Sequence, residues 1–142
     1  MSKVRDAMTH DFDCVLPASR ITEVAEKMAD YETDTIPVCE NGNFRGVIKE
    51  RDITAYIVVT GDNPSRECAL TLIDRTHPMV SPGDDLFQAA KIMAANGVNV
   101  LPVTQNKRLV GILSVDDIAK VSLAAAAAVL VKSAKEKQAV FR

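Results

Sequence analysis

The chain has 142 residues, of which 47% are hydrophobic and 25% are charged, and its net charge at pH 7 is −2. This length is enough for one ordinary domain whose core needs neither a disulfide nor a metal ion. Because acidic and basic residues are interspersed, the sequence lacks the positive field on which most nucleic-acid binding depends. We therefore expect no nucleic-acid partner.

The start of the chain and its longest apolar run bear on location. Residues 1–20 carry charges throughout, so they do not fit the apolar centre of a signal peptide, and we expect a cytoplasmic protein. The apolar run at 121–131 is about half of the roughly 20 residues that a membrane-spanning helix needs. We therefore expect no membrane association.

Metal and catalytic chemistry have little support in the sequence. Cys14, Cys39 and Cys68 are odd in number and contain no CxxC pair, which favours free thiols over a disulfide framework or a zinc site. His10 and His77 have no metal-ligand spacing to other residues, and we expect both at surface or turn positions. We accordingly expect no catalytic residue and no enzyme activity.

An internal repeat organises the chain. When the sequence is compared with itself, an offset of 65 residues aligns two halves without a gap. Apolar positions match between the identities, so the register holds over the whole repeat. The identical pairs are Val15 with Val80, Pro17 with Pro82, Ala25 with Ala90, Met28 with Met93, Pro37 with Pro102, Val38 with Val103, Gly46 with Gly111, Asp52 with Asp117 and Ile53 with Ile118.

Each half predicts the same order of elements, β-α-β-β-α. A short β segment (14–16 or 79–80) precedes a helix with apolar residues at helical spacing, for which Ser19 or Asp84 is a plausible N-cap. Two apolar runs separated by polar turn residues then predict a hairpin, and a second helix follows it. The predicted divisions are a first repeat at 1–61, a linker at 62–66, a second repeat at 67–121 and a C-terminal helical extension at 122–142.

One such repeat is too small to bury its own apolar faces well. We therefore expect an α+β or α/β fold in which the two repeats pack with pseudo-two-fold symmetry. This pairing would create two equivalent clefts where the hairpins meet the helices, and small ligands tend to bind in such places.

The segment that ends the second hairpin is the strongest candidate site. Ser114 stands near the N-cap of the last helix, where free backbone amides favour an anion such as phosphate. Asp117 follows three residues later, and its carboxylate could accept from the two hydroxyls of a ribose. A simple capping arrangement, which would only stabilise the helix, explains the same spacing.

In the first half Asp52 recurs, but Lys49 stands where the second half has Ser114. Lys49 and Arg51 place two cations beside a helix start, which is unfavourable for the helix dipole but suited to phosphate. The alternative is that both side chains point to water or pair with neighbouring acids.

These features together resemble the cystathionine β-synthase (CBS) domain family. The resemblance rests on an IPV or LPV strand, the segments GVIKERDI and GILSVDDI, and the opening VRDAMT, and it covers Val4 to about Ala119. In this family a pair of repeats forms a Bateman module, and two modules commonly form a dimer. The resemblance implies regulatory binding of AMP, ADP or ATP, with S-adenosylmethionine or NAD as further candidates, no catalytic cofactor, and an unknown regulated protein on a separate chain.

The resemblance also implies roles for individual residues. In the Gly-x-x-Ser/Thr-x-x-Asp pattern the Asp binds ribose and the Ser or Thr binds phosphate, which Asp117 and Ser114 match in full. Asp52 matches, whereas Lys49 departs from the pattern and puts a phosphate contact of the family type in doubt for the first half. The base would be embraced by residues around the strand before each hairpin turn, with the pocket completed near the first β segment: Thr35, Ile36, Pro37, Val100, Leu101, Pro102, Val15 and Val80.

The tail at 122–142 has high helix propensity, and we expect it to extend the last helix. Its apolar stripe would serve dimerisation or would cover the module's own core. Two functions from different classes remain open: a nucleotide-sensing regulatory module, and a structural dimerisation module without a physiological ligand.

Overall fold

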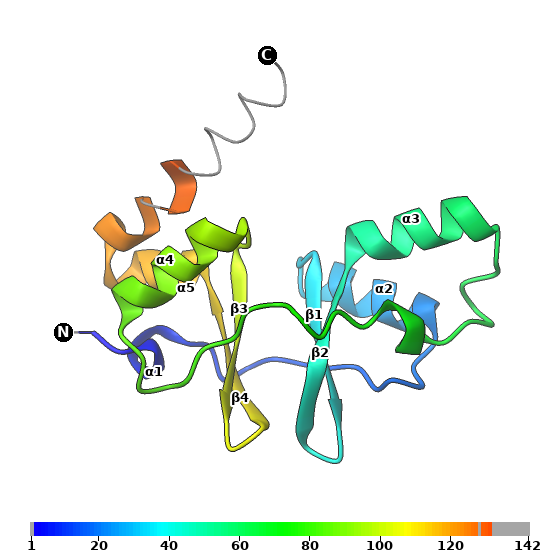
Figure 1. Cartoon of the computed structure of the whole chain (residues 1–142), viewed down its shortest axis with the longest axis horizontal. Helices are drawn as coiled ribbons and strands as arrows, with labels where there is room; N and C mark the ends of the chain where they lie inside the picture. The colour runs from blue at the N-terminus through cyan, green and yellow to red at the C-terminus, as the bar shows by residue number, and fades with distance from the viewer. Residues whose placement is uncertain (1, 128, 132–142) are drawn as a thin grey trace. The chain divides into compact units, whose positions relative to one another are not determined.

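The computed structural model describes residues 2–127 and 129–131, and the chain divides into two compact units. One unit is formed by Asp13–His77, and we call it the first-repeat unit. The other, the second-repeat unit, combines Met1–Phe12 with the chain from Pro78 onward. Both units are mixed α+β structures, each with one antiparallel hairpin and its helices (Figure 1), which confirms the predicted fold class.

Each unit has the same order of main elements: a helix, two strands and a second helix. In the first-repeat unit these are α2 (Ile21–Asp30), β1 (Thr35–Glu40), β2 (Asn43–Lys49) and α3 (Glu50–Thr60), followed by a 3₁₀ turn, η1 (Ala69–Leu72). In the second-repeat unit they are α4 (Leu86–Asn96), β3 (Val100–Gln105), β4 (Arg108–Ser114) and α5 (Val115–Val121), with α1 (Val4–Ala7) contributed by the start of the chain.

Tight turns close both hairpins. Asn41 and Gly42 have φ of 54° and 81°, and Asn106 and Lys107 have φ of 53° and 67°. Two consecutive positive φ values match the right-handed twist of the strands, and asparagine and glycine reach them with the least strain. Lys107 therefore stands at a backbone position that favours glycine.

The helix starts differ from the predicted N-caps. Helix α2 is preceded by Arg20 and helix α4 by Asp85, whose carboxylate accepts from the Gln88 N–H. Ser19 and Asp84 instead close the turn before each helix: Ser19 Oγ accepts from Leu16 N–H at 2.9 Å, and Asp84 Oδ2 accepts from the Ser81 N–H at 2.8 Å. The pattern identified a capping residue one position too early, because the same residue types also close such turns.

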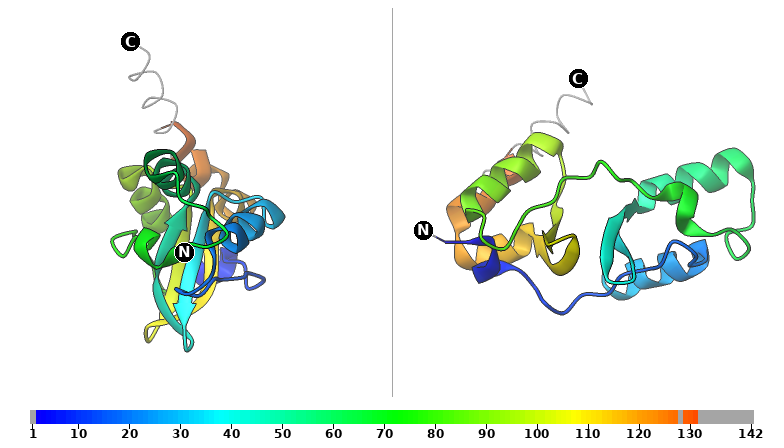
Figure 2. Two further views of the ribbon diagram at one scale, coloured as in Figure 1. Left: turned by 90° about the vertical axis from the view of Figure 1, so that its right-hand side faces the viewer. Right: turned by 60° about the horizontal axis from the view of Figure 1, so that its bottom comes forward.

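The segments that precede the two repeats are exchanged between the units (Figure 2). Thr9, which precedes the first repeat, forms an antiparallel bridge with Ile112 of β4. At the position 65 residues later, Asp74 forms the matching bridge with Val47 of β2. Each repeat is thus completed by the chain that leads into the other repeat.

A glycine permits each of these close approaches. A Cβ on Gly46 would lie 2.5 Å from the Asp74 carbonyl oxygen, and Gly46 has a φ of +134°. A Cβ on Gly111 would lie 2.8 Å from Met8 Sδ and 3.2 Å from the Thr9 carbonyl oxygen. The glycine that aligns in both repeats is explained by this packing.

The two units have hydrophobic cores of different extent. The first-repeat core consists of Val15, Val24, Met28, Ile36, Val38, Ile48 and Ala69. The second-repeat core contains the corresponding strand and helix residues, with Val4 in the place of Ala69, and is extended by Ala125, Ala126 and Val129 from the tail. No residue of α3 is buried, whereas α5 buries Asp117 and Ile118.

The sequence predicted that the tail would extend the last helix. The structure differs, because the last helix stops before the tail begins. Helix α5 ends at Val121, and Ser122 has extended backbone angles (φ −145°, ψ 100°). Residues 123–127 and 129–131 are helical again, and Ser122 Oγ accepts from the Ala125 N–H at 3.3 Å. Ser122 therefore starts a separate helix, since serine is favoured at an N-cap; the predicted helix at 132–142 lies outside the described residues.

Two further expectations concern single features. His77 is buried, with 4% of its surface exposed, so it is not a surface residue, although it stands at a bend outside the helices and strands; His10 is exposed. Within the residues that the structure describes, no helix is long and apolar enough to cross a membrane.

Candidate functional site

Ser114 and Asp117 form a reciprocal cap where β4 passes into α5. Ser114 Oγ accepts from the Asp117 N–H at 3.1 Å, and Asp117 Oδ2 accepts from the Ser114 N–H at 2.9 Å. This is the capping arrangement that the sequence left open as an alternative. It fixes the position of the Asp117 carboxylate at the helix start.

A third residue holds the same carboxylate and is not needed for capping. The Thr9 hydroxyl donates to Asp117 Oδ1 at 2.9 Å, across 108 positions of sequence. Asp117 is only 7% exposed. Sequence reasoning missed Thr9, although it belongs to the VRDAMT segment and aligns with Asp74 at the repeat offset. We call Thr9, Ser114 and Asp117 the carboxylate cluster.

The predicted base-contacting residues of the second repeat lie beside this cluster. Val100 of β3 is the register partner of Ser114, and the Val80 N–H donates to the Pro102 carbonyl at 3.1 Å. The side chains of Leu101 and Val80 are 0% and 3% exposed and belong to the core. Leu101 and Val80 therefore contribute their side chains to the core beside this cluster.

The corresponding position of the first repeat holds an ion pair. Lys49 Nζ lies 3.2 Å from Asp74 Oδ2, and the two side chains are 17% and 22% exposed. Hydrogen bonds from the Thr76 hydroxyl (2.7 Å) and N–H (2.8 Å) to Asp74 Oδ1, together with Lys49, lower the pKa of Asp74 to about 2. The Lys49 charge is compensated within its own unit, by a partner other than the neighbouring acids that the sequence suggested.

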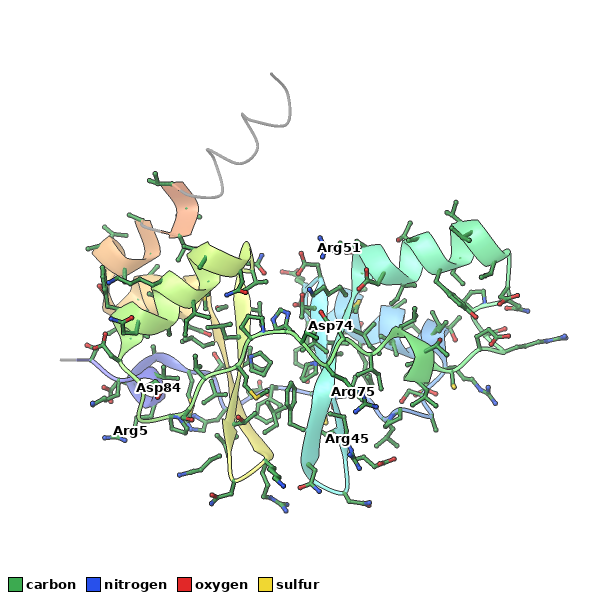
Figure 3. The ribbon with its side chains drawn as sticks, in the orientation of Figure 1. Arg5, Arg45, Arg51, Asp74, Arg75 and Asp84 are labelled. Carbon is green, nitrogen blue, oxygen red and sulfur yellow. The ribbon has the colours of Figure 1, made fainter. Side chains whose placement is uncertain are left out.

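Asp52 and Arg51 lie at the start of α3 in a more open setting. The side chain of Asp52 is 44% exposed and that of Arg51 is 79% exposed, with 3.9 Å between Arg51 Nε and Asp52 Oδ1. Such an exposed and long contact contributes little energy. Figure 3 shows Arg51 projecting from the start of α3, whereas Asp74 lies against β2.

The remaining predicted residues of the first repeat lie along β1. Thr35 is the register partner of Lys49, and the Val15 N–H donates to the Pro37 carbonyl at 3.0 Å. Ile36 and Val15 are each 2% exposed and belong to the core. Both sets of predicted residues are thus gathered at matching places, one set in each unit, and only the second set includes a carboxylate held by a threonine and a serine.

Metal ions bind where several His, Cys, Asp or Glu side chains come together, and the residues that the structure describes were compared with this requirement. Among these residues, no group of three or more His, Cys, Asp or Glu side chains is arranged to hold a metal ion.

Comparison with known proteins places the chain in a family. The CBS domain model matches residues 4–59 and 71–124, once for each repeat. A "CBS domain-containing protein YhcV" of Bacillus subtilis is 32% identical over 122 residues, which cover 84% of each chain. "Hypoxic response protein 1" of Mycobacterium tuberculosis is 26% identical over 121 residues, covering 84% of this chain and 85% of that protein.

Solved structures agree with this assignment. A crystal structure of Hypoxic Response Protein I with two coordinated zinc ions matches with a TM-score of 0.76 and 25% identity, covering 85% of this chain and 99% of that one. CBSX2 in complex with AMP matches with a TM-score of 0.75 and 20% identity, covering 87% and 97%. At 20% identity the second likeness concerns the fold alone.

Proposed function

Since this chain belongs to the CBS-domain family, we propose that it is a regulatory module that binds an adenine nucleotide or another adenosyl ligand at the carboxylate cluster. In this proposal it acts by binding rather than by catalysis and signals to a protein on a separate chain. The observation that carries the proposal is the Asp117 carboxylate, which is buried yet held by donors from two segments far apart in sequence.

The chemistry of Asp117 suits a ribose. Each of its two oxygens accepts one hydrogen bond, from Thr9 and from Ser114, so each keeps a further lone pair. Two neighbouring hydroxyls of a ribose could donate to both oxygens at once. Hydrogen bonds to an ionised carboxylate are about twice as strong as neutral ones, and a carboxylate already fixed in place loses little freedom on binding.

The ligand class is supported by the family and by one neighbour. CBSX2, whose fold this chain shares, is solved in complex with AMP. AMP, ADP and ATP are therefore the first candidates, and S-adenosylmethionine and NAD carry the same adenosyl group. The phosphate end would lie toward Ser114, and Val100, Leu101 and Pro102 would border the base.

Regulation would follow from the position of Thr9. Thr9 belongs to the exchanged segment that enters the first repeat, while Asp117 belongs to the second repeat. A ligand on Asp117 that binds better when Thr9 is in place would stabilise this segment, by at most its difference in affinity for the two states. The chain would act as a homodimer that presents this change to its partner protein.

A structural dimerisation module is the alternative function, and one observation favours it. Helix α3 has no buried residue, and its Val58 and Val59 are 78% and 83% exposed. In a dimerisation module these exposed valines would form part of the association surface. This function would require no ligand at Asp117.

Calorimetric titration with AMP, ADP, ATP, S-adenosylmethionine and NADH tests the proposal, with Asp117→Asn and Asp52→Asn as matched variants. Asp117→Asn keeps the shape but loses the charge, so we expect it to weaken binding of the recognised ligand at least about tenfold, the loss of one charge-assisted hydrogen bond. Asp52→Asn, at the same position of the other repeat, should leave the affinity at the second repeat within about twofold.

Binding that Asp52→Asn abolishes and Asp117→Asn leaves unchanged would move the site to the first repeat. No binding of any of these ligands to the intact protein would refute the adenosyl-ligand proposal. A dimer by ultracentrifugation in that case would favour the structural module.

A further inference from the structure

Lys49 and Ser114 stand at the same backbone position of their repeats, between the second strand and the helix that follows it. Lys49 is the register partner of Thr35, and Ser114 is the register partner of Val100. In the proposed function, the phosphate end of a ligand lies beside Ser114. The side chains at the aligned position therefore decide whether the first repeat can bind a second ligand.

The start of α3 favours negative charge. Lys49 precedes this helix of 11 residues and caps it with no side-chain hydrogen bond, whereas Ser114 caps α5 by accepting from the Asp117 N–H. Amides without a cap favour an anion at a helix start, and the Lys49 ammonium adds a full positive charge beside them. A phosphate group would suit this position, but an anion from the chain itself is already there.

Asp74 is that anion. Lys49 Nζ lies 3.2 Å from Asp74 Oδ2, and both side chains are half-buried. Among the residues that the structure describes, no other acidic side chain pairs with Lys49. Asp74 is held independently of Lys49, because the Thr76 hydroxyl and N–H donate to Asp74 Oδ1 at 2.7 and 2.8 Å. The Asp74 carboxylate is thus fixed in place before Lys49 contacts it.

We propose that the Asp74 carboxylate occupies, in the first repeat, the place that the phosphate of a ligand would take, so that the chain binds one adenosyl ligand rather than two. This inference rests on the proposed function, because it assigns the ligand to the second repeat alone. Asp74 repels a second anion and pairs with the cation that would attract it. In the second repeat the aligned residue is Thr9, which is uncharged and donates to Asp117 instead.

The ribose end of the first repeat is weakened as well. The side chain of Asp52 is 44% exposed, and its ion-pair contact with Arg51 Nε is 3.9 Å long. The residues aligned with Ser114 and Thr9 supply no hydroxyl to hold this carboxylate. A carboxylate that is free to move loses more freedom on binding than one already fixed, as Asp117 is.

Removal of the Asp74 charge should open the position to an anion. In Asp74→Asn the amide keeps the shape of the carboxylate and still accepts from Thr76, while Lys49 loses its partner. A half-buried cation without a counter-ion is unfavourable, and a bound anion relieves this cost. We therefore expect Asp74→Asn to bind inorganic pyrophosphate at least about tenfold more tightly than the wild type, and Lys49→Met in the same chain to remove the gain.

Glu40→Gln is the matched control for this calorimetric titration with pyrophosphate. Arg45 Nη2 lies 3.0 Å from Glu40 Oε1 in the same unit, but both side chains are exposed. Glu40→Gln therefore removes one negative charge without freeing a cation at a helix start, and it should leave the pyrophosphate affinity within about twofold. Urea unfolding of each variant checks that it is folded.

Calorimetric titration with AMP, ADP and ATP then counts the ligands. For the nucleotide that binds, we expect one site per wild-type chain and a second, Lys49-dependent site in Asp74→Asn. Two sites in the wild type, or pyrophosphate binding that Asp74→Asn does not strengthen, would overturn the proposal. Absence of nucleotide binding to the wild type would refute the adenosyl-ligand function instead, while the pyrophosphate comparison would still decide whether Asp74 closes the first repeat.

Discussion

The two repeats place different chemistry at the same backbone position, the junction of the second strand with the following helix. In the second repeat, Thr9 holds a buried Asp117 that caps α5. In the first repeat, the residue aligned with Thr9 is Asp74, and it forms an ion pair with Lys49. The backbone bridges are the same in both repeats. This comparison teaches that the exchanged segment is required by the fold, whereas the residue it presents determines what the position can bind.

The cores differ in a related way. The second repeat gains residues of the tail helix, for which the first-repeat core has no equivalent, whereas Val4 is matched 65 positions later by Ala69 of the first-repeat core. In the first repeat, helix α3 exposes Val58 and Val59. The repeat that carries the carboxylate cluster is therefore the more completely covered one, and the following predictions test how far the two repeats differ.

The largest effect is expected from the aligned glycines. Gly46→Ala should destabilise the protein by about 3 kcal/mol, because its φ is positive and its Cβ would strike the backbone of Asp74. Gly111→Ala should cost about 1 kcal/mol, because the nearest obstacle is the flexible Met8 side chain. Urea unfolding of both variants measures the difference; equal losses would mean that the two approaches are equally tight.

A pH-dependent difference should follow from Asp74. The pKa of Asp74 is lowered to about 2 from an ordinary value of 3.8. The ionised Asp74 therefore adds to the free energy of unfolding above pH 4, and this addition is lost as pH falls from about 4 to 2. The contribution is at most about 2 kcal/mol. Urea unfolding at a series of pH values measures this. Between pH 4 and pH 2 the free energy of unfolding should fall less in Asp74→Asn than in the wild type. A parallel loss in both proteins would contradict the role of Asp74.

The next prediction converts the first repeat toward the second. Lys49→Ser with Asp74→Thr reproduces the residues aligned with Ser114 and Thr9, so Asp52 gains the donors that Asp117 has. In an Asp117→Asn background, where binding at the second repeat is weakened, we expect the affinity of the first repeat for the recognised ligand to improve about tenfold, or about 1.4 kcal/mol. Calorimetric titration compares this triple variant with the Asp117→Asn single variant. Unchanged affinity would show that further residues separate the repeats.

The smallest effect concerns the hairpin turns. Lys107 has a φ of 67° where the first repeat has Gly42. Lys107→Gly should stabilise the protein by about 0.5 kcal/mol, because relief of strain exceeds the entropy that glycine adds to the unfolded chain. Gly42→Lys should be destabilising by a similar amount. Thermal unfolding of the two single variants measures both, and a lower Tm for Lys107→Gly would count against strain at this turn.

Local pattern predicted much of this architecture. The repeat, the hairpins and the main helices follow from apolar spacing and from turn residues such as Asn41 and Gly42, because these signals act over a few neighbouring positions. The start of the tail helix was misjudged, since helix propensity in the alanine-rich stretch outweighed the single serine at 122 that starts a new helix.

Contacts between distant segments could not be predicted in this way. Ser114 and Asp117 were identifiable because they lie within one turn of helix, whereas Thr9 reaches Asp117 from 108 positions away. Likewise, Lys49 appeared free for phosphate until the exchanged segment brought Asp74 to it. Periodicity reports which face of an element is apolar, and it carries no information about which distant segment covers that face.

The exchange of leading segments also affects how the protein is made. Residues 13–77 contain one entire compact unit, so every segment of this unit has been synthesised before translation reaches Pro78. Residues 1–12 leave the ribosome before residues 13–77 but join the unit that begins again at Pro78. They must wait, without their native partners, until β3, β4 and α5 have been synthesised. The carboxylate cluster, which needs both Thr9 and Asp117, therefore cannot form until α5 has been synthesised.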